Sequence, residues 1–300
     1  MTYTKPLLKW VGGKTQIIET VINSFPKEFN NYHEIFTGGG SVLLALLDSI
    51  NSGKIKVNGV VNSYDLNESL IYLYKNIQSS PTEFYETVEK LIKEFNSCQN
   101  ENINRKPKNL TEALENKENY YYWIRNIYNN QLDKKEIYSS ALFLFLNKTC
   151  FRGMYRTGPN GFNVPYGNYK KPEILNKVHL DKISKLIKDV NFEVLPFEKS
   201  INNSKSEDFI YLDPPYAPID KNSFVGYTKD GFSLESNQSL FDLIKSKEVP
   251  FVMSNADVEF VRFNFPEGKF EISSISCKRS INSKDPGSKV QELLIKYPLV

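Results

Sequence analysis

A four-residue motif, Asp213-Pro214-Pro215-Tyr216, directly follows the mostly apolar run Asp208–Leu212, which reads as a buried strand. A carboxylate at the carboxyl end of a strand lies where open α/β sheets bind ligands. The two prolines have no backbone N–H, so the carbonyl groups beside them stay available as acceptors. The carboxylate of Asp213 and the carbonyl of Pro214 therefore make an acceptor pair suited to an exocyclic amino group, and Tyr216 offers a ring face for a planar base. A plain proline-rich turn is the alternative, and it fits a lone Pro-Pro better than this quartet.

A glycine-rich turn, Phe36-Thr37-Gly38-Gly39-Gly40-Ser41, forms the second candidate site. Glycine permits a tight turn and the close approach of a ligand to a helix N-terminus. A dinucleotide fingerprint that starts at Gly38 would need glycine where Leu43 stands, which excludes that class of oxidoreductase. Asp65, at the end of the next apolar run, could accept hydrogen bonds from a ribose hydroxyl pair, as in any site for a nucleoside-bearing cofactor.

The N-terminal stretch Lys9-Trp10-Val11-Gly12-Gly13-Lys14-Thr15 is the third candidate. Its end resembles a phosphate-binding P-loop, but that pattern requires glycine where Leu8 stands, and no apolar strand precedes it. A nucleotide triphosphatase is therefore excluded. Tryptophan followed by Gly-Gly-Lys favours a lid that offers an aromatic contact and a cation to an anionic group. A core tryptophan beside a solvated lysine is the alternative.

These motifs need strands that end at one edge of a sheet. The order strand, glycine turn, helix (Ser41–Leu47) is how a parallel α/β sheet begins. The runs that we expect as buried strands are His33–Phe36, Val57–Tyr64, Asp208–Leu212 and Val249–Ser254. The segments Phe270–Cys277 and Gln291–Tyr297 follow each other too closely for a helical crossover, so they should pair antiparallel at the sheet edge.

The middle of the chain has a different pattern. Helical periodicity is expected over Pro81–Phe95, Asn119–Asn130 and Lys134–Asn147, and a hairpin over Met154–Val164 with its turn at Gly158-Pro159-Asn160-Gly161. We therefore expect a mostly helical insertion over residues 68–175, between residues 1–67 and 176–300 of one α/β domain.

Composition narrows the class of protein. The 300 residues carry 38 basic and 35 acidic side chains. Charged residues make up 24% of the chain and aromatic residues 13%, a composition that argues against disorder. No apolar run reaches the roughly 18 residues of a membrane span, and no secretory signal is visible. The cysteines Cys98, Cys150 and Cys277 are far apart, so neither a zinc cluster nor a disulfide framework is expected. We expect a cytoplasmic protein that has no contact with a membrane and no metal.

Charge is unevenly distributed along the chain. From Ala141 to Pro172 there is no acidic residue, and aromatic residues are interleaved with the basic ones, which are Lys148, Arg152, Arg156, Lys170 and Lys171. A second basic stretch contains Lys278, Arg279, Lys284 and Lys289. Such patches are typical of a polyanion partner, although a solvated face is an equal alternative on composition alone.

Taken together, the motifs resemble those of the Dam-like family of DNA adenine-N6 methyltransferases, over nearly the whole chain. The family has the same order: Lys-Trp-x-Gly-Gly-Lys, the glycine turn, an acidic strand end, an insertion, and Asp-Pro-Pro-Tyr. Further matches are Asn163-Val164-Pro165-Tyr166-Gly167, Ser254-Asn255 and Arg279-Ser280-Ile281. The resemblance implies a Rossmann-like methyltransferase sheet with an antiparallel edge strand. Residues 1–67 and 176–300 would form the catalytic domain, and residues 68–175 would form the DNA-recognition domain.

The resemblance also implies roles for individual residues. S-adenosylmethionine would lie over the glycine turn, with its methionine part near Trp10 and Lys14, its ribose on Asp65 and its adenine against Phe197. The cofactor-binding residues implied are Trp10, Lys14, Phe36, Gly38, Gly40, Ser41, Asp65, Phe197 and Asp213. The DNA-binding residues implied are Lys9, Phe151, Arg152, Met154, Arg156, Pro165, Asn168 and Tyr169.

Within this set, Lys9 and Arg156 would read guanines, and Met154 and Pro165 would touch a thymine methyl group, which favours the sequence GATC. Phe151 would wedge into the gap that a flipped base leaves. The implied partners are double-stranded DNA and, where the enzyme protects DNA, a cognate restriction endonuclease.

The catalytic residues Asp213, Pro214, Pro215 and Tyr216 would act on an adenine turned out of the duplex. Hydrogen bonds from N6 to the acceptor pair favour a tetrahedral nitrogen whose lone pair can attack the methyl group. Two alternatives stay open: cytosine-N4 methylation, which asks for the same acceptors, and a catalytically silent DNA-binding protein. We expect the Asp213 carboxylate to face an open site, not to be buried against a lysine.

Overall fold

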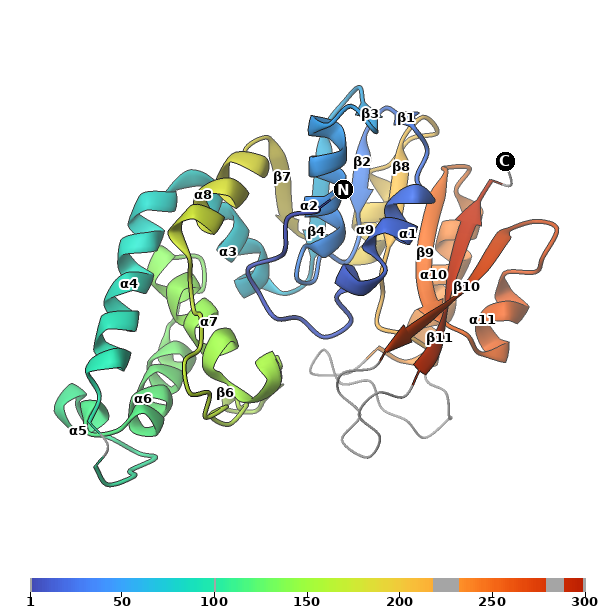
Figure 1. Ribbon diagram of the computed structural model, residues 1–300. Coiled ribbons are helices and arrows are strands. Elements are labelled where there is room, and N and C mark those ends of the chain that lie inside the picture. The colour runs from blue at the N-terminus through green and yellow to red at the C-terminus, as the bar shows by residue number, and fades with distance from the viewer. Residues whose placement is uncertain (1, 100, 218–231, 279–288, 299–300) are drawn as a thin grey trace. The chain divides into compact units, whose positions relative to one another are not determined.

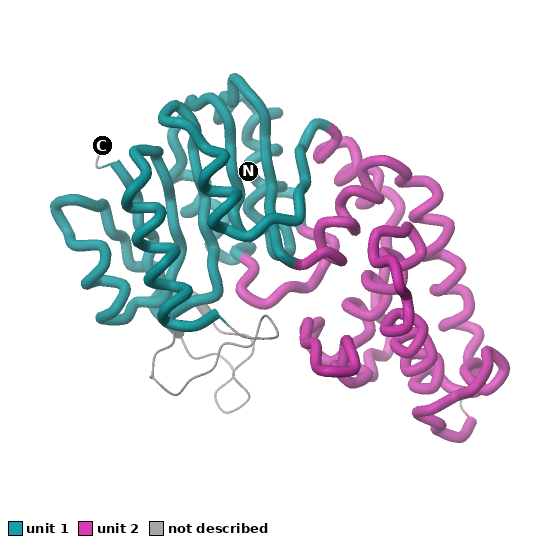
Figure 2. Tube along the Cα trace, turned by 180° about the vertical axis from the view of Figure 1, so that it is seen from behind, with its two compact units in different colours: residues 1–5, 14–66, 189–300 teal, residues 6–13, 67–188 magenta. Residues whose placement is uncertain are grey.

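The computed structural model describes residues 2–99, 101–217, 232–278 and 289–298 (Figure 1). The Arg279-Ser280-Ile281 motif and Lys284 lie outside the described residues. The chain divides into two compact units (Figure 2). Unit 1 comprises Met1–Lys5, Lys14–Leu66 and Asp189–Val300, and unit 2 comprises Pro6–Gly13 and Asn67–Lys188.

Unit 1 is built on one seven-stranded sheet, counted over the described residues, in the order β10-β11-β9-β8-β2-β4-β7. The strands are β2 (Tyr32–Glu34), β4 (Val61–Asp65), β7 (Val190–Val194), β8 (Phe209–Leu212), β9 (Phe251–Ala256), β10 (Glu271–Lys278) and β11 (Lys289–Tyr297). The strands from β9 to β7 run parallel, whereas β11 pairs antiparallel with both β9 and β10. The predicted antiparallel edge is therefore confirmed.

Helices cover both faces of this sheet, with α1 and α2 on one face and α9 and α10 on the other (Figure 1). The helical elements of unit 1 are η1 (Lys14–Gln16), α1 (Ile18–Asn23), α2 (Ser41–Asn51), α9 (Phe197–Asn202), α10 (Leu234–Ser246) and α11 (Glu259–Asn264). Helix α2 is buried along most of its length, which explains its nearly continuous apolar sequence.

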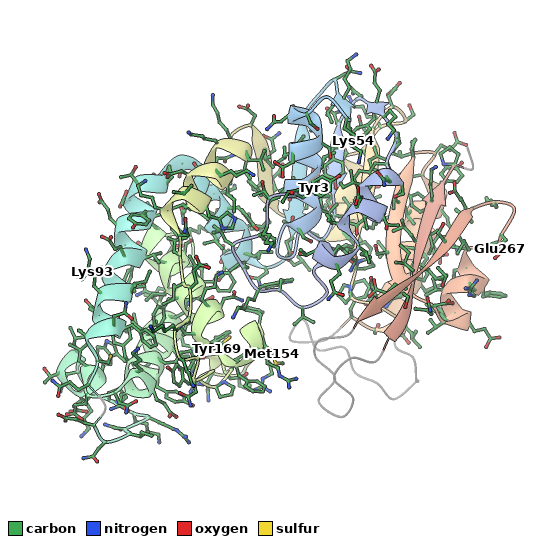
Figure 3. All side chains as sticks on the ribbon, in the orientation of Figure 1. Tyr3, Lys54, Lys93, Met154, Tyr169 and Glu267 are labelled. Carbon is green, nitrogen blue, oxygen red and sulfur yellow. The ribbon has the colours of Figure 1, made fainter. Side chains whose placement is uncertain are left out.

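At the start of the chain, the hydroxyl of Tyr3 accepts a hydrogen bond from Lys54, and both residues are labelled in Figure 3.

The order in which the chain adds strands to the sheet reverses between β2 and β8, which are parallel neighbours. From β2 it proceeds through β4 to β7, and it then returns to place β8 on the other side of β2. Such a switch in strand order opens a crevice outside the carboxyl ends of the two strands, where open α/β sheets bind ligands.

Two strand predictions were wrong. The run Val57–Tyr64 forms two strands, since β3 (Lys56–Val57) pairs with β1 (Glu28–Phe29) in a separate two-stranded sheet and β4 begins only at Val61. The chain turns at Gly59, where an added Cβ would lie 2.1 Å from the amide oxygen of Asn31. Strand β7 was missed because the prediction relied on continuous apolar runs. In β7, at the edge of the sheet, exposed residues interrupt the buried ones.

Unit 2 is mostly helical. Its helical elements are α3 (Glu68–Ser79), α4 (Pro81–Ser97), α5 (Leu110–Leu114), α6 (Lys117–Asn130), α7 (Ile137–Thr149), η2 (Phe151–Gly153) and α8 (Lys177–Leu186). Helix α7 is buried along almost its whole length, and α4 and α8 present apolar stripes. The two-residue strands β5 (Thr157–Gly158) and β6 (Gly161–Phe162) pair antiparallel.

The bounds of unit 2 differ from the expected residues 68–175 at two places. Helix α8 belongs to it, because Leu180, Ile183 and Ile187 are buried and α8 packs on α3 and α4. The segment Pro6–Gly13 also belongs to it, through contacts of Lys9 and Trp10 described below. No helix in the described ranges is both long and apolar enough to cross a membrane.

Candidate active site

The switch point of the sheet brings two of the sequence motifs together. The glycine turn follows β2, and Asp213 follows β8, which is the parallel neighbour of β2. Asp65 ends β4 on the other side of β2. The carboxyl edge of the sheet in unit 1 therefore carries both candidate motifs and the acidic strand end.

Lys14 contacts the motif after β8. Its ammonium Nζ lies 2.8 Å from Oδ1 of Asp213 and 4.9 Å from the ring centroid of Tyr216. The Lys14 side chain is 3% exposed and that of Asp213 is 20% exposed. The expectation of an open carboxylate thus holds only in part, because a lysine does pair with Asp213 while a fifth of the side chain remains accessible.

The charge state of Asp213 reflects competing influences. Burial raises the pKa of its carboxyl above the ordinary value, the ammonium of Lys14 lowers it, and the nearby carboxylate of Glu292 raises it again. Burial and the carboxylates of Asp213 and Glu292 raise the pKa of Tyr216 well above its usual range, so its hydroxyl stays a donor. That hydroxyl donates to Oε2 of Glu292 at 2.8 Å.

A second buried acid lies on β2. Glu34 is 2% exposed, and its Oε2 accepts a hydrogen bond from the hydroxyl of Tyr32 at 2.8 Å. Burial raises the pKa of Glu34 to about 8, and the charge of Asp213 adds to this effect. Glu34 is therefore mostly protonated at neutral pH.

The glycine turn is held by hydrogen bonds to β4 and to the N-terminal segment. Gly38 and Gly40 have φ of +50° and +72°, the region that favours glycine. The backbone N–H of Gly38 donates to Oδ2 of Asp65 at 3.0 Å, and the N–H of Lys14 donates to the hydroxyl of Ser41 at 3.1 Å. The turn thus leads into α2 with Asp65 directly beside it.

Aromatic rings gather next to this turn. Phe36 and Phe197 have ring centroids 6.2 Å apart, and Phe232 lies 6.0 Å from each of them. Phe197 is 8% exposed and Phe36 is half-buried. Together with the Asp65 carboxylate and the glycine turn, these rings suit a ligand that combines a flat base with ribose hydroxyls.

In unit 2, the side chain of Asn147 holds the backbone of Lys9 in place. The N–H of Lys9 donates to Oδ1 of Asn147 at 2.9 Å, and Nδ2 of Asn147 donates back to the carbonyl of Lys9 at 2.8 Å. Gly153 approaches so closely that an added Cβ would lie 2.4 Å from Cβ of Lys9. The Nζ of Lys9 lies 4.4 Å from the ring centroid of Tyr169. The lysine side chain remains exposed, although its base is fixed.

The other predicted DNA-binding residues lie between α7 and α8, where Figure 3 labels Met154 and Tyr169. The hydroxyl of Tyr169 accepts a hydrogen bond from the N–H of Arg152 at 2.9 Å, and Phe151 is 44% exposed. Arg152 and Asn168 both adopt positive φ, at 56° and 50°. Pro165 is exposed and Met154 is half-buried.

Arg156 and Trp10 have partners within unit 2. The guanidinium Nε of Arg156 donates to Oδ1 of Asn163 at 2.6 Å, across the hairpin. The indole of Trp10 stacks on the ring of Tyr155 at 5.5 Å and meets Phe143 edge-on at 6.5 Å. Trp10 thus packs against aromatic rings of unit 2, whereas Lys14 is buried and not solvated as the simpler interpretation of this stretch expected.

Sequence reasoning missed four residues that the structure places at these sites: Glu34, Asn147, Phe232 and Glu292. Glu34 had a usable signal, since it is an acid inside a predicted buried strand. The others touch the motifs only through partners distant in sequence, and no local pattern marks them.

Comparison with known proteins identifies the family. Residues 10–281 match the family described as D12 class N6 adenine-specific DNA methyltransferase. The type II methyltransferase M.MjaIII of Methanocaldococcus jannaschii is 36% identical, over 97% of this chain and 98% of that protein. The DNA adenine methylase of Haemophilus influenzae is 30% identical, over 97% and 92%, and that of Escherichia coli is 26% identical, over 99% and 96%. The chain belongs to the D12 class of N6 adenine-specific DNA methyltransferases.

Proposed function

We propose that this adenine-N6 DNA methyltransferase takes the methyl group from S-adenosylmethionine and acts on an adenine turned out of the duplex, within GATC. The observation that carries the proposal is the placement of Lys14. A nitrogen that bears N–H donors lies on the Asp213 carboxylate and against the ring of Tyr216. The exocyclic amino group of a flipped adenine needs the same two contacts.

The residues of the motif prepare N6 for attack. Its lone pair is delocalised into the ring, and hydrogen bonds from N6 to Asp213 and to the carbonyl of Pro214 favour the tetrahedral nitrogen that localises it. S-adenosylmethionine, when bound, supplies an electrophilic methyl group on a sulfonium. N6 forms the new bond to carbon, the electron pair of the broken carbon–sulfur bond stays on sulfur, and N6 gives up one proton to solvent. Positioning is the main task of the protein here.

The carboxyl edge of unit 1 suits this cofactor. The glycine turn at the start of α2, the Asp65 carboxylate and the rings of Phe36 and Phe197 match a methionine-bearing adenosine. Lys14, which we expected near the methionine part, touches Asp213. We assign it to the acceptor site.

Unit 2 would read the DNA. Lys9, Arg156 and Arg152 carry exposed cations. Phe151, next to Arg152 in the chain, and Pro165 are exposed apolar groups. Lysine and arginine recognise guanine edges, and apolar groups touch the thymine methyl. Flipping costs a few kcal/mol, and stacking of the base on Tyr216 would offset part of this cost. Relatives named type II methyltransferases make a cognate restriction endonuclease a reasonable partner.

The test is incubation of the protein with S-adenosylmethionine and plasmid DNA, followed by nucleoside analysis and mapping of the methylated positions. We expect N6-methyladenine within GATC, and Asp213→Ala should lose turnover while it retains DNA binding, since phosphate contacts dominate affinity. Methylation at another sequence would refute the GATC assignment. Near-full activity of Asp213→Ala would refute the acceptor pair.

A further inference from the structure

Two strands that lie far along the chain hold Tyr216 in place. Its hydroxyl donates to Oε2 of Glu292 on β11 at 2.8 Å. The next peptide N–H, that of Ala217, donates to Oδ1 of Asn255 on β9 at 3.1 Å. One contact fixes the tip of the side chain and the other fixes the backbone beside it.

The register of the sheet explains why these contacts occur together. Glu292 lies opposite Ala256 in the antiparallel β11–β9 pair, and Asn255 is the neighbour of Ala256. Asn255 is fully buried, and its Oδ1 also accepts from the N–H of Ala256 at 2.8 Å. Strand β11, which carries none of the motifs, therefore reaches the loop after β8 through Glu292.

We propose that Glu292 is a positioning residue, which holds the ring of Tyr216 at the angle required to stack on the target base. The inference rests on the proposed function of Tyr216. A tyrosine side chain turns about two bonds, so a fixed backbone alone leaves the ring free to rotate away. The hydrogen bond to Glu292 removes this freedom before the base arrives, so that the site does not spend binding free energy on ordering the ring.

The negative charge of Glu292 opposes the ionised form of Asp213 that the proposed reaction needs. A positioning role of Glu292 can therefore be distinguished from an electrostatic one. The Glu292 carboxylate raises the pKa of Asp213 and so disfavours its ionised form. A residue retained for charge alone would hinder the reaction. Glu292→Gln keeps an acceptor for the hydroxyl of Tyr216 and removes the charge, whereas Glu292→Ala removes both.

The experiment measures kcat, KM and their pH dependence for Glu292→Gln, Glu292→Ala, Tyr216→Phe and the double variant Tyr216→Phe/Glu292→Ala. We expect Glu292→Ala and Tyr216→Phe each to lose about tenfold in kcat, as removal of one hydrogen bond does. The double variant should lose no more than either single variant, because both remove the same contact. Glu292→Gln should keep kcat, with the acid limb of its pH profile moved to lower pH.

A fluorescent base reports the ring directly. With 2-aminopurine in place of the target adenine, the wild type should hold the flipped base stacked and quenched, and Glu292→Ala should show brighter emission. Glu271→Ala is the matched control, since Glu271 is an acid on β10 that pairs with Lys296. This variant should behave as wild type in every assay.

Full kcat in Glu292→Ala, or losses that multiply in the double variant, would overturn the inference. If Glu292→Ala does not fold, Tyr216→Phe still removes the hydrogen bond with the carboxylate in place, and full activity there overturns the inference too. Loss of activity in Asp213→Ala beside full activity in Glu292→Ala would leave the proposed function standing and remove this inference alone.

Discussion

The ammonium of Lys14 lies 2.8 Å from Oδ1 of Asp213, although the two residues are separated by nearly two hundred positions in the chain. The ion pair has two consequences. It favours the charged carboxylate against the effect of burial, and it occupies an acceptor that an amino group of the substrate needs. Lys14 must therefore yield or share Oδ1 when a base binds.

Replacement of Lys14 should change the pH dependence of the reaction. Ionised Asp213 is a stronger acceptor than the protonated acid and has both oxygens free to accept, so activity should fall as the pH drops through its pKa. Lys14→Met removes the cation that lowers this pKa, and the acid limb of kcat should move to higher pH. Measurement of kcat from about pH 5.5 to 9.5 checks the shift. Lys14→Arg keeps the charge and should leave the limb near its wild-type position. An unchanged profile in Lys14→Met would contradict the coupling.

Glu34 should make the stability of the protein depend on pH. Its folded pKa of about 8 lies above the ordinary value of 4.5, so the folded state retains a proton that the unfolded state has lost. The free energy of unfolding should therefore decline as the pH rises from 4.5 to about 8, at up to about 1.4 kcal/mol per unit.

Denaturant unfolding of the wild type and Glu34→Gln checks this decline. The glutamine keeps an acceptor for Tyr32 and does not titrate. The variant should gain stability relative to wild type as the pH rises to 8, with little difference at about pH 4.5. Parallel pH profiles of the two proteins would show that Glu34 does not titrate as argued.

Gly153→Ala should displace Lys9 and weaken DNA recognition. The new Cβ would lie 2.4 Å from Cβ of Lys9, and the positive φ of 63° adds strain of about 1 kcal/mol. Gly12→Ala is the matched control, because Gly12 has φ of 81° with nothing within 4 Å of the added atom. Both variants should lose the stability that a positive φ costs, and Gly153→Ala should lose more because of the clash with Lys9. Only Gly153→Ala should lose discrimination of about 1–3 kcal/mol at one base pair. Equal DNA specificity in the two variants would refute the role assigned to Lys9.

Arg156→Ala should relax the choice of base at one position. An arginine that forms two hydrogen bonds to guanine contributes about 1–3 kcal/mol of discrimination. Asn163→Ala should produce a smaller loss, because it frees the guanidinium that Asn163 now orients. Arg105→Ala, which removes an exposed arginine paired with Glu118, is the control and should not alter base preference. Methylation of duplexes substituted at each base pair of the site measures the effect.

Local sequence was enough to predict the chemistry of the motifs and part of the sheet. The absence of N–H groups at Pro214 and Pro215 is covalent, so the acceptor character of that turn needs no fold. The antiparallel edge was predictable because the chain between β10 and β11 is too short for a helical crossover. The glycine turn and α2 likewise follow from residues that are adjacent in the chain.

Contacts between residues distant in sequence were decided by the tertiary structure, through the order of the strands and the packing of the helices. The sheet places β8 beside β2, and the antiparallel β11 beside β9, so that Glu292 reaches Tyr216. Asn147 on α7 binds the backbone of Lys9, which draws Pro6–Gly13 into unit 2 against expectation. The proton on Glu34 and the partner of Lys14 follow from burial and from neighbours distant in sequence. Spacing patterns report which residues share one face of one element, and they do not report which elements become neighbours.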